Sequence, residues 1–206
     1  NSLVATFTPT DTSNWNTGTT NNSIVVARGT PALSWLPNPL VGITYPMALT
    51  NSQLSASATN SPLNPGFAAP VGTWVYRDGS SNLVSSNTIL DAGTNSLVAT
   101  FTPTDTSNWN TGATTNNSIV VARGTPALSW LPNPLEPITY PTALTNNQLS
   151  ATSDGVLGKF EYRLGSVTGN IVSNNTVLNA GTNLLVAIFK PSNTINWNTG
   201  SSTSNV

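Results

Sequence analysis

The sequence contains no cysteine and no histidine, and among its 206 residues only 6 are Lys or Arg and 7 are Asp or Glu. The missing thiol and imidazole groups exclude disulfides, thiolate nucleophiles, histidine bases and the usual zinc sites, and we expect no cofactor or bound metal. Six cations are too few for a nucleic-acid-binding surface. Uninterrupted apolar runs extend for only a few residues, so no membrane-spanning segment is expected.

Small uncharged polar residues and aromatic residues take the place of the missing charge. Asn, Ser and Thr make up 84 of the 206 residues, the net charge is -1, and there are 6 Trp, 4 Tyr and 5 Phe. Disordered chains usually combine few aromatic residues with a high net charge. The composition therefore predicts a folded β protein whose surface is polar but uncharged.

Internal repeats organise the chain. Residues 1–18 and 95–112 have the same eighteen letters, NSLVATFTPTDTSNWNTG, and residues 183–200 are a diverged third copy. The motif RGTPALSWLPNPL occurs at 28–40 and again at 123–135. A period of 88 to 95 residues is longer than a propeller blade or a helical solenoid unit. It is the size of a whole small β-sandwich.

The repeat frame divides the chain into three domains. Residues 1–27 are predicted to be the C-terminal hairpin of a preceding unit, and residues 28–122 a complete unit. Residues 123–206 are predicted to be a further unit that lacks most of its last strand, because Val206 aligns with Ile119. We therefore expect the sequence to be an excerpt from a longer array of units.

Short alternating segments predict the strands of one unit. Strands are predicted near residues 32–35, 43–46, 49–58, 73–77, 83–84, 89–90, 97–101 and 118–122. No window of the sequence has helical spacing over 11 residues. About seven short strands joined by turns are typical of an antiparallel β-sandwich. The predicted core of the complete unit consists of Leu33, Trp35, Leu54, Trp74, Tyr76, Leu90, Leu97, Phe101, Ile119 and Val121.

Two motifs carry a family resemblance. They are ITYPTALTNNQLSA (138–151) followed by VLNAGTNLLVAIFKPSNTINW (177–197), and their counterparts stand in the same order at 43–56 and 89–109. Together these motifs resemble the immunoglobulin-like repeats of large bacterial surface proteins and adhesins. The resemblance implies an all-β chain of tandem immunoglobulin-like antiparallel β-sandwiches, located outside the cell or on its surface, whose partners are neighbouring repeats of the same protein.

Catalytic chemistry has few candidate residues. Asp78 and Asp91 are replaced by Leu164 and Asn179 in the last unit, so no acid pair recurs for glycoside hydrolysis, and we expect no enzyme activity. A loop beginning at Asp105 loosely suggests a calcium site, but it offers one carboxylate where calcium usually takes several. Turn capping by this aspartate is the favoured interpretation.

Charged residues in the last unit and at the unit boundary are expected to lie on the surface. Lys159 and Glu161 alternate with Phe160 and are predicted to form an exposed ion pair, which stabilises a fold only weakly. Arg123, at the boundary between units, is predicted to be solvated or paired at the rim.

Four aromatic residues are candidate ligand or interface residues. Trp15, Trp109 and Trp197 each stand in an NWNTG motif, where they serve either as packing anchors or as platforms for sugars. Phe67 lies in a Pro- and Gly-rich loop that is nine residues longer than its counterpart. This loop either packs on itself or contacts a neighbour or ligand, since loops often carry function.

Three sequons, at Asn21, Asn116 and Asn174, permit N-glycosylation. In a chain with 28 Asn and 56 Ser or Thr, three such matches are expected by chance. The sequence therefore identifies acceptor positions and leaves their use open.

Three functions are compatible with the sequence. The first is a non-catalytic structural repeat that acts as a rigid spacer or stalk of a long extracellular surface protein or adhesin. The second is a subunit of a self-assembling extracellular filament, in which copies join head to tail by strand complementation. The third is a carbohydrate-binding module that uses the loop tryptophans to bind surface glycans.

Overall fold

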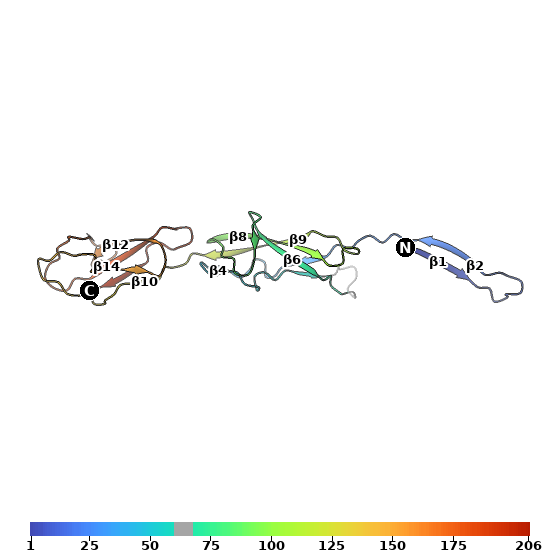
Figure 1. The fold of residues 1–206 in the computed structure, drawn as a ribbon, viewed down its shortest axis with the longest axis horizontal. Coiled ribbons are helices and arrows are strands. Elements are labelled where there is room, and N and C mark those ends of the chain that lie inside the picture. The colour runs from blue at the N-terminus through green and yellow to red at the C-terminus, as the bar shows by residue number, and fades with distance from the viewer. Residues whose placement is uncertain (60–67) are drawn as a thin grey trace. The chain divides into compact units, whose positions relative to one another are not determined.

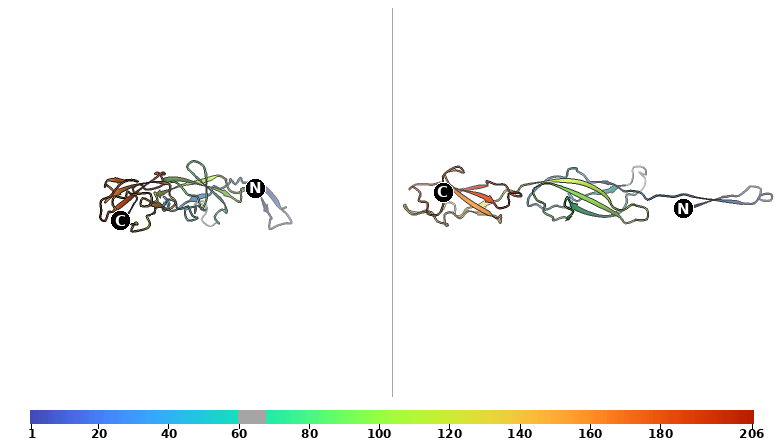
Figure 2. Two further views of the ribbon diagram at one scale, coloured as in Figure 1. Left: turned by 60° about the vertical axis from the view of Figure 1, so that its left-hand side comes forward. Right: turned by 90° about the horizontal axis from the view of Figure 1, so that it is seen from above.

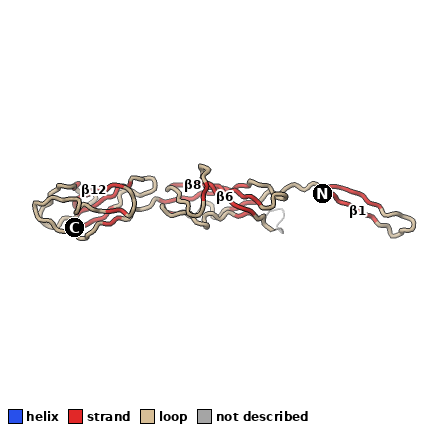
Figure 3. The backbone as a smooth tube through the Cα atoms, in the orientation of Figure 1, coloured by secondary structure: helices blue, strands red, loops and turns tan. Residues whose placement is uncertain are grey.

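The computed structural model describes residues 1–59 and 68–206. In these two ranges the protein is all-β and contains no helix (Figure 3), which confirms the all-β prediction. The chain divides into two compact units, one made of residues 1–35, 56–75 and 99–115 and the other of residues 36–55, 76–98 and 116–206. Phe67 lies outside the described residues.

Fifteen strands are present in the described ranges (Figure 1). They are β1 (Ser2–Phe7), β2 (Gly18–Ser23), β3 (Ala32–Ser34), β4 (Ile43–Thr44), β5 (Ser57–Thr59), β6 (Gly72–Asp78), β7 (Leu83–Val84), β8 (Gly93–Pro103), β9 (Ala113–Ala122), β10 (Leu128–Ser129), β11 (Thr152–Ser153), β12 (Gly158–Leu164), β13 (Ile171–Val172), β14 (Leu185–Pro191) and β15 (Ser202–Asn205). The sheets have the strand orders β1-β2, β3-β5, β10-β11, β4-β9-β8-β6-β7 and β13-β12-β14-β15.

Strands β1 and β2 form an antiparallel hairpin (Figures 1 and 2). Ser2 pairs with Ser23 at one end of the hairpin and Phe7 pairs with Gly18 at the other. Every residue of both strands is exposed, and Phe7 is 70% exposed. This hairpin therefore has a hydrogen-bonded ladder but no buried face.

The five-stranded sheet of residues 28–122 contains the strongest predicted strands. Strand β8 alternates strictly, so that Leu97, Ala99 and Phe101 are buried, as period-2 side-chain alternation requires. On β9 the same alternation buries Ile119 and Val121. Both strands are longer than predicted, because polar Thr and Asn residues extend each ladder beyond its apolar core.

The four-stranded sheet of residues 123–206 covers a separate core. Strand β14 contributes Leu185 and Ala187, which pack in one cluster with Trp130, Leu144 and Val172. Partly buried aromatic residues of β12 pack against this cluster. The chain has no cysteine, so this core forms without a disulfide, by apolar burial and ring packing.

The predicted strand at 49–58 is wrong in its first half. Residues 51–54 form a turn, and β5 begins only at Ser57. The Gln53 side-chain carbonyl oxygen accepts hydrogen bonds from the backbone N–H and the hydroxyl of Thr50, at 3.0 and 2.6 Å. A Thr followed three residues later by Gln is a capping-box spacing, and it turns the chain where apolar alternation predicted extension. Residues 89–90, also predicted as a strand, lie outside the strands of the structure.

The alignment of Val206 with Ile119 is wrong by one residue. Asn205 donates to the carbonyl of Pro132 at 2.7 Å, as Asn117 donates to the carbonyl of Pro37 at 2.8 Å. The buried amide sets the register, and Val206 therefore takes the position of Ser118. The carbonyls of Ser118 and Val206 accept equivalent backbone hydrogen bonds, from Leu40 and Leu135 respectively.

Candidate functional site

The contacts between the 28–122 and 123–206 segments surround Trp197, within the second compact unit. The Trp197 ring packs on Gly124, where a Cβ atom would lie 2.7 Å from the ring. The N–H of Gly124 donates to the carbonyl of Asn196 at 2.9 Å, and its carbonyl accepts from the N–H of Asn198 at 2.8 Å. This close approach explains why glycine stands at position 124.

Residues of the 28–122 segment complete this junction. The Tyr45 ring meets the Trp197 ring edge-on, with 5.3 Å between centroids and an interplanar angle of 88°, which is a favourable aromatic geometry. The N–H of Tyr45 donates to the carbonyl of Ala122 at 2.9 Å. Tyr45 is therefore held by the last strand of its own segment and presents its ring to the next segment.

Asn196 links the two segments by two hydrogen bonds. Its side-chain N–H donates to Oδ1 of Asp91 at 2.7 Å, and its side-chain oxygen accepts from the N–H of Ala92 at 2.7 Å. The Asn196 residue is only 3% exposed, so water competes little for these bonds. Because the donor and the acceptor of this buried amide are both bonded, it fixes both the distance and the orientation between the two segments at this point.

The loop before Trp197 explains why this amide is available. In the matching loop of the 28–122 segment, the side-chain amide of Asn108 donates to Oδ2 of Asp105 at 2.8 Å. Asn193 stands in place of that aspartate, and its side-chain oxygen accepts only backbone N–H groups, from Ile195 and Asn196. The substitution of Asp by Asn therefore leaves the Asn196 amide to bond with Asp91.

Arg123 lies on the surface of the junction, as predicted. Its side chain is exposed, and its Nε–H donates to the carbonyl of Ile195 at 3.0 Å. This bond ties the linker between the segments to the loop that carries Trp197. Sequence reasoning singled out Arg123 and Trp197, and it considered Asp91 only as a catalytic acid. It missed Tyr45 and the bond between Asn196 and Asp91, whose signal was the change from Asp105 to Asn193.

The three loop tryptophans have different environments. Trp109 is half-buried and packs on Gly29, where a Cβ atom would lie 3.0 Å from its ring, in the manner of Trp197 on Gly124. Trp15 is 68% exposed. Trp109 and Trp197 thus occupy packing positions over glycine, and part of each ring is covered by the chain itself.

The aspartates of the loops cap turns. Oδ1 of Asp105 accepts from the N–H groups of Ser107 and Asn108, each at 3.1 Å, and Asp11 makes the same pattern in its own loop. The hydrogen bond from the Asn108 side chain is the main cause that lowers the pKa of Asp105. In the described ranges, no group of three or more acidic side chains converges as a metal site would require.

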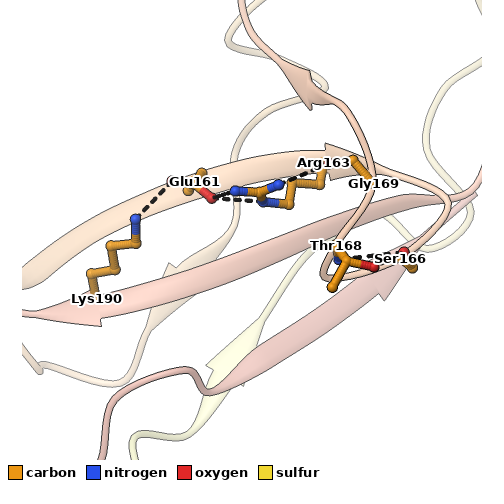
Figure 4. Close-up of polar contacts among 6 residues, drawn as sticks. All are labelled: Glu161, Arg163, Ser166, Thr168, Gly169 and Lys190. Atoms are coloured by element: carbon orange, nitrogen blue, oxygen red, sulfur yellow. Dashed lines mark hydrogen bonds and ion pairs between the residues drawn. The ribbon is translucent and has the colours of Figure 1, made fainter.

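The predicted ion pair of Glu161 has different partners (Figure 4). Glu161 pairs with Arg163 at 2.6 Å and with Lys190 at 2.7 Å, and not with Lys159 as expected. Lys159 lies opposite Lys190 in the β12–β14 register. Arg163 lies two residues after Glu161 on the same strand, as Lys159 lies two residues before it, so the strand pattern offered both partners. Lys190 reaches the carboxylate from the neighbouring strand β14, which the pattern of one strand could not show. Their hydrogen bonds, first that of Lys190, lower the pKa of Glu161.

These pKa shifts predict how stability depends on pH. Four carboxyl groups have lowered pKa values, those of Asp11, Asp78, Asp105 and Glu161. Their contribution to the free energy of unfolding is present above their unfolded pKa of about 4 and is lost as the pH falls through the folded values. Burial raises the pKa of Tyr162 above its usual 10.0, so the contribution of Tyr162 to the free energy of unfolding is lost as the pH rises beyond that value.

We expect the free energy of unfolding to be nearly constant from about pH 5 to 9. Urea titrations across this range test the expectation, and a fall of more than about 2 kcal/mol inside it would contradict it.

The three sequon asparagines are exposed. Asn21 lies on β2 and Asn116 on β9. Asn174 lies in a turn, where its side-chain amide donates to Oδ1 of Asn146 at 2.7 Å. All three residues are thus exposed, and the side-chain amide of Asn174 is engaged in a hydrogen bond.

Comparison of the chain with models of known families, with curated proteins and with solved structures found no match. The residues described by the structure form no helix that is long and apolar enough to cross a membrane.

Proposed function

We propose that this protein is a non-catalytic structural chain of tandem immunoglobulin-like β-sandwiches that acts as a rigid spacer or stalk of an extracellular surface protein or adhesin. The observation that carries the proposal is the junction around Trp197. There, a buried amide, an edge-on aromatic pair and a backbone bond to Arg123 tie one segment to the next. A spacer needs such bonds, because an unfastened linker would let neighbouring domains move freely.

The scarcity of charge supports the same role. With 13 charged residues in 206, the surface depends on small polar groups for its solubility, and screening by salt has little to act on. The free energy of unfolding is expected to change little with pH near neutrality. Low sensitivity to salt and to pH suits a spacer, which must keep one geometry in changing surroundings.

Spin-label distances test the spacer role. The chain has no cysteine, so the double variant Ser80→Cys, Ser166→Cys places one label on an exposed residue of each segment. We expect a narrow distance distribution, and a clearly broader one when Asn196→Ala removes the two bonds to Asp91 and Ala92. The matched control is Asn108→Ala, which removes a bond inside one segment and should leave the width unchanged. A broad distribution in the parent double variant would refute a rigid junction.

Glycan binding is the competing function from another class. Trp15 is the most exposed of the three loop tryptophans, and its ring is therefore the first candidate platform. A glycan array with the full chain and with Trp15→Ala separates the two functions. Binding that Trp15→Ala abolishes would support a carbohydrate-binding module over a spacer.

A further inference from the structure

A shallow groove of about 590 Å³ lies along β12 on the 123–206 segment. Its lining combines a half-buried aromatic ring, charged side chains of β12 and β14, and amides from two turns. These residues are Phe160, Lys159, Glu161, Lys190, Asn146 and Asn174. An apolar ring beside a few hydrogen-bonding side chains is the usual composition of a site for a small ligand.

The 28–122 segment has uncharged residues at the charged positions of this groove. Lys159, Glu161 and Lys190 stand where the matching strands of that segment have a threonine, a valine and a threonine. They include both lysines of the chain, although only 6% of all residues are charged. The groove therefore differs in charge from the matching surface of a closely similar segment.

Glu161 binds two of the cations at this surface and leaves a third without a partner (Figure 4). Its carboxylate pairs with Lys190 at 2.7 Å and with Arg163 at 2.6 Å. Lys159 lies opposite Lys190 in the β12–β14 register, and within residues 1–59 and 68–206 it forms no ion pair. Three cations against one carboxylate make the surface positive, and the Lys159 ammonium is available to an anion from outside.

The amides of Asn146 and Asn174 are held in place but keep free hydrogen-bonding groups. The Asn174 side-chain N–H donates to Oδ1 of Asn146 at 2.7 Å. In the part of the chain that the structure describes, the Asn146 side-chain N–H groups and the Asn174 side-chain oxygen have no further partner. The pair thus offers a donor and an acceptor together, which suits a sugar hydroxyl because a hydroxyl both donates and accepts.

Phe160 supplies an apolar surface that is fixed before any ligand binds. Its ring packs on the rings of Tyr162 and Phe189, with 6.1 and 4.9 Å between centroids. The Tyr162 hydroxyl donates to the carbonyl of Leu149 at 2.8 Å, which fastens β12 to the turn that carries Asn146. A site whose parts are already ordered loses less conformational entropy on binding.

We propose that this groove binds a carboxylated sugar, namely a uronic or sialic acid residue of a glycan. The Lys159 ammonium pairs with the carboxylate, and the Phe160 ring packs against the apolar face of the sugar ring. The side chains of Asn146 and Asn174 bond the sugar hydroxyls. Glu161 disfavours an acidic peptide or a nucleic acid, because its charge repels a partner that is negative at every unit. The proposal goes beyond the spacer role and uses a surface other than the loop tryptophans.

A nuclear magnetic resonance titration of the full chain tests the site. The probes are methyl glucuronide, the methyl glycoside of N-acetylneuraminic acid, and uncharged methyl glucoside. We expect weak, saturable shifts of the backbone amides of Lys159, Phe160 and Asn174 with at least one carboxylated probe, which identifies the kind of acid. Methyl glucoside should bind at least about tenfold more weakly. No saturable shift with either acid, or equal affinity for methyl glucoside, would overturn the proposal.

Two variants that copy the 28–122 segment test the named contacts. Lys159→Thr and Asn174→Ser introduce the residues of the matching positions, Thr73 and Ser86, and the same spectra show that each variant is folded. Lys159→Thr should lower the affinity for the carboxylated probe about tenfold or more, and Asn174→Ser about fivefold. The matched control is Arg77→Thr, which removes one positive charge from an exposed residue of the other segment and should leave the affinity unchanged. Equal losses from Arg77→Thr and Lys159→Thr would contradict a specific contact.

Two further results would assign binding differently. Tighter binding of tetraglutamate than of either acidic sugar, at the same amides, would make the groove a site for an acidic peptide. Shifts confined to Trp15, Trp109 and Trp197 would place sugar binding on the loop tryptophans. Either result would overturn the proposal and leave the spacer role intact, because the spin-label distances test that role separately.

Discussion

Replacing Gly124 by valine is expected to destabilise the 123–206 segment by about 2 kcal/mol and to loosen its junction with the 28–122 segment. A Cβ atom at this position would clash with the carbonyl oxygen of Tyr45 and lie 2.7 Å from the Trp197 ring. The carbonyl belongs to the backbone, and the ring lies between Gly124 and Tyr45. Moving either of them to make room for the new side chain would therefore cost free energy. Differential scanning calorimetry and the spin-label width measured on the same variant report the two effects.

Gly29→Val is the matched control for this change. Gly29 also lies against a tryptophan, but the three atoms nearest to a Cβ atom there all belong to the Trp109 ring, at 3.0 to 3.6 Å, and no backbone carbonyl is among them. The valine at Gly29 should therefore cost less than the valine at Gly124. Equal costs at both glycines would show that the tryptophan alone, and not the contact with Tyr45, sets the requirement for glycine at the junction.

Alternation of apolar residues predicted the principal strands because it reports directly on a half-buried sheet. Leu97 and Phe101 on β8 and Ile119 and Val121 on β9 were predicted to be core residues, and all four are buried. The failure at 49–58 has a local cause: the side chains of Thr50 and Gln53 satisfy the backbone of a turn, and polar capping overrides apolar alternation.

The junction could be predicted only in part, because its bonds join residues that are far apart in the chain. The NWNTG repeats identified Trp109 and Trp197 as recurring anchors. Nothing in the spacing of residues linked Asn196 to Asp91, whose side chains meet across 105 positions. The Lys190 partner of Glu161 was missed for the same reason, since Lys190 reaches it from the neighbouring strand.

The largest loss of stability is expected from Trp130→Ala, which should cost about 3–5 kcal/mol. Trp130 is 3% exposed, and its Nε1–H donates to the carbonyl of Gln148 at 2.8 Å. Its ring meets Tyr162 with 5.2 Å between centroids, and its carbonyl accepts from the side chain of Asn205 at 3.0 Å. Alanine would remove the ring from the centre of this core and leave the carbonyl of Gln148 without its donor.

Trp130→Phe separates packing from hydrogen bonding at this position. Phenylalanine keeps most of the apolar volume but cannot donate to Gln148, so its cost should be smaller, about 1–3 kcal/mol for one unsatisfied buried acceptor. Hydrogen exchange measured on β12 and β14 by mass spectrometry places the loss in the 123–206 segment, and amides of β8 serve as the internal reference. If Trp130→Ala left the protection of β12 and β14 intact, Trp130 would not be the centre of that core. If Trp130→Phe cost as much as alanine, the hydrogen bond to Gln148, and not the packing of the ring on Tyr162, would be the dominant contribution.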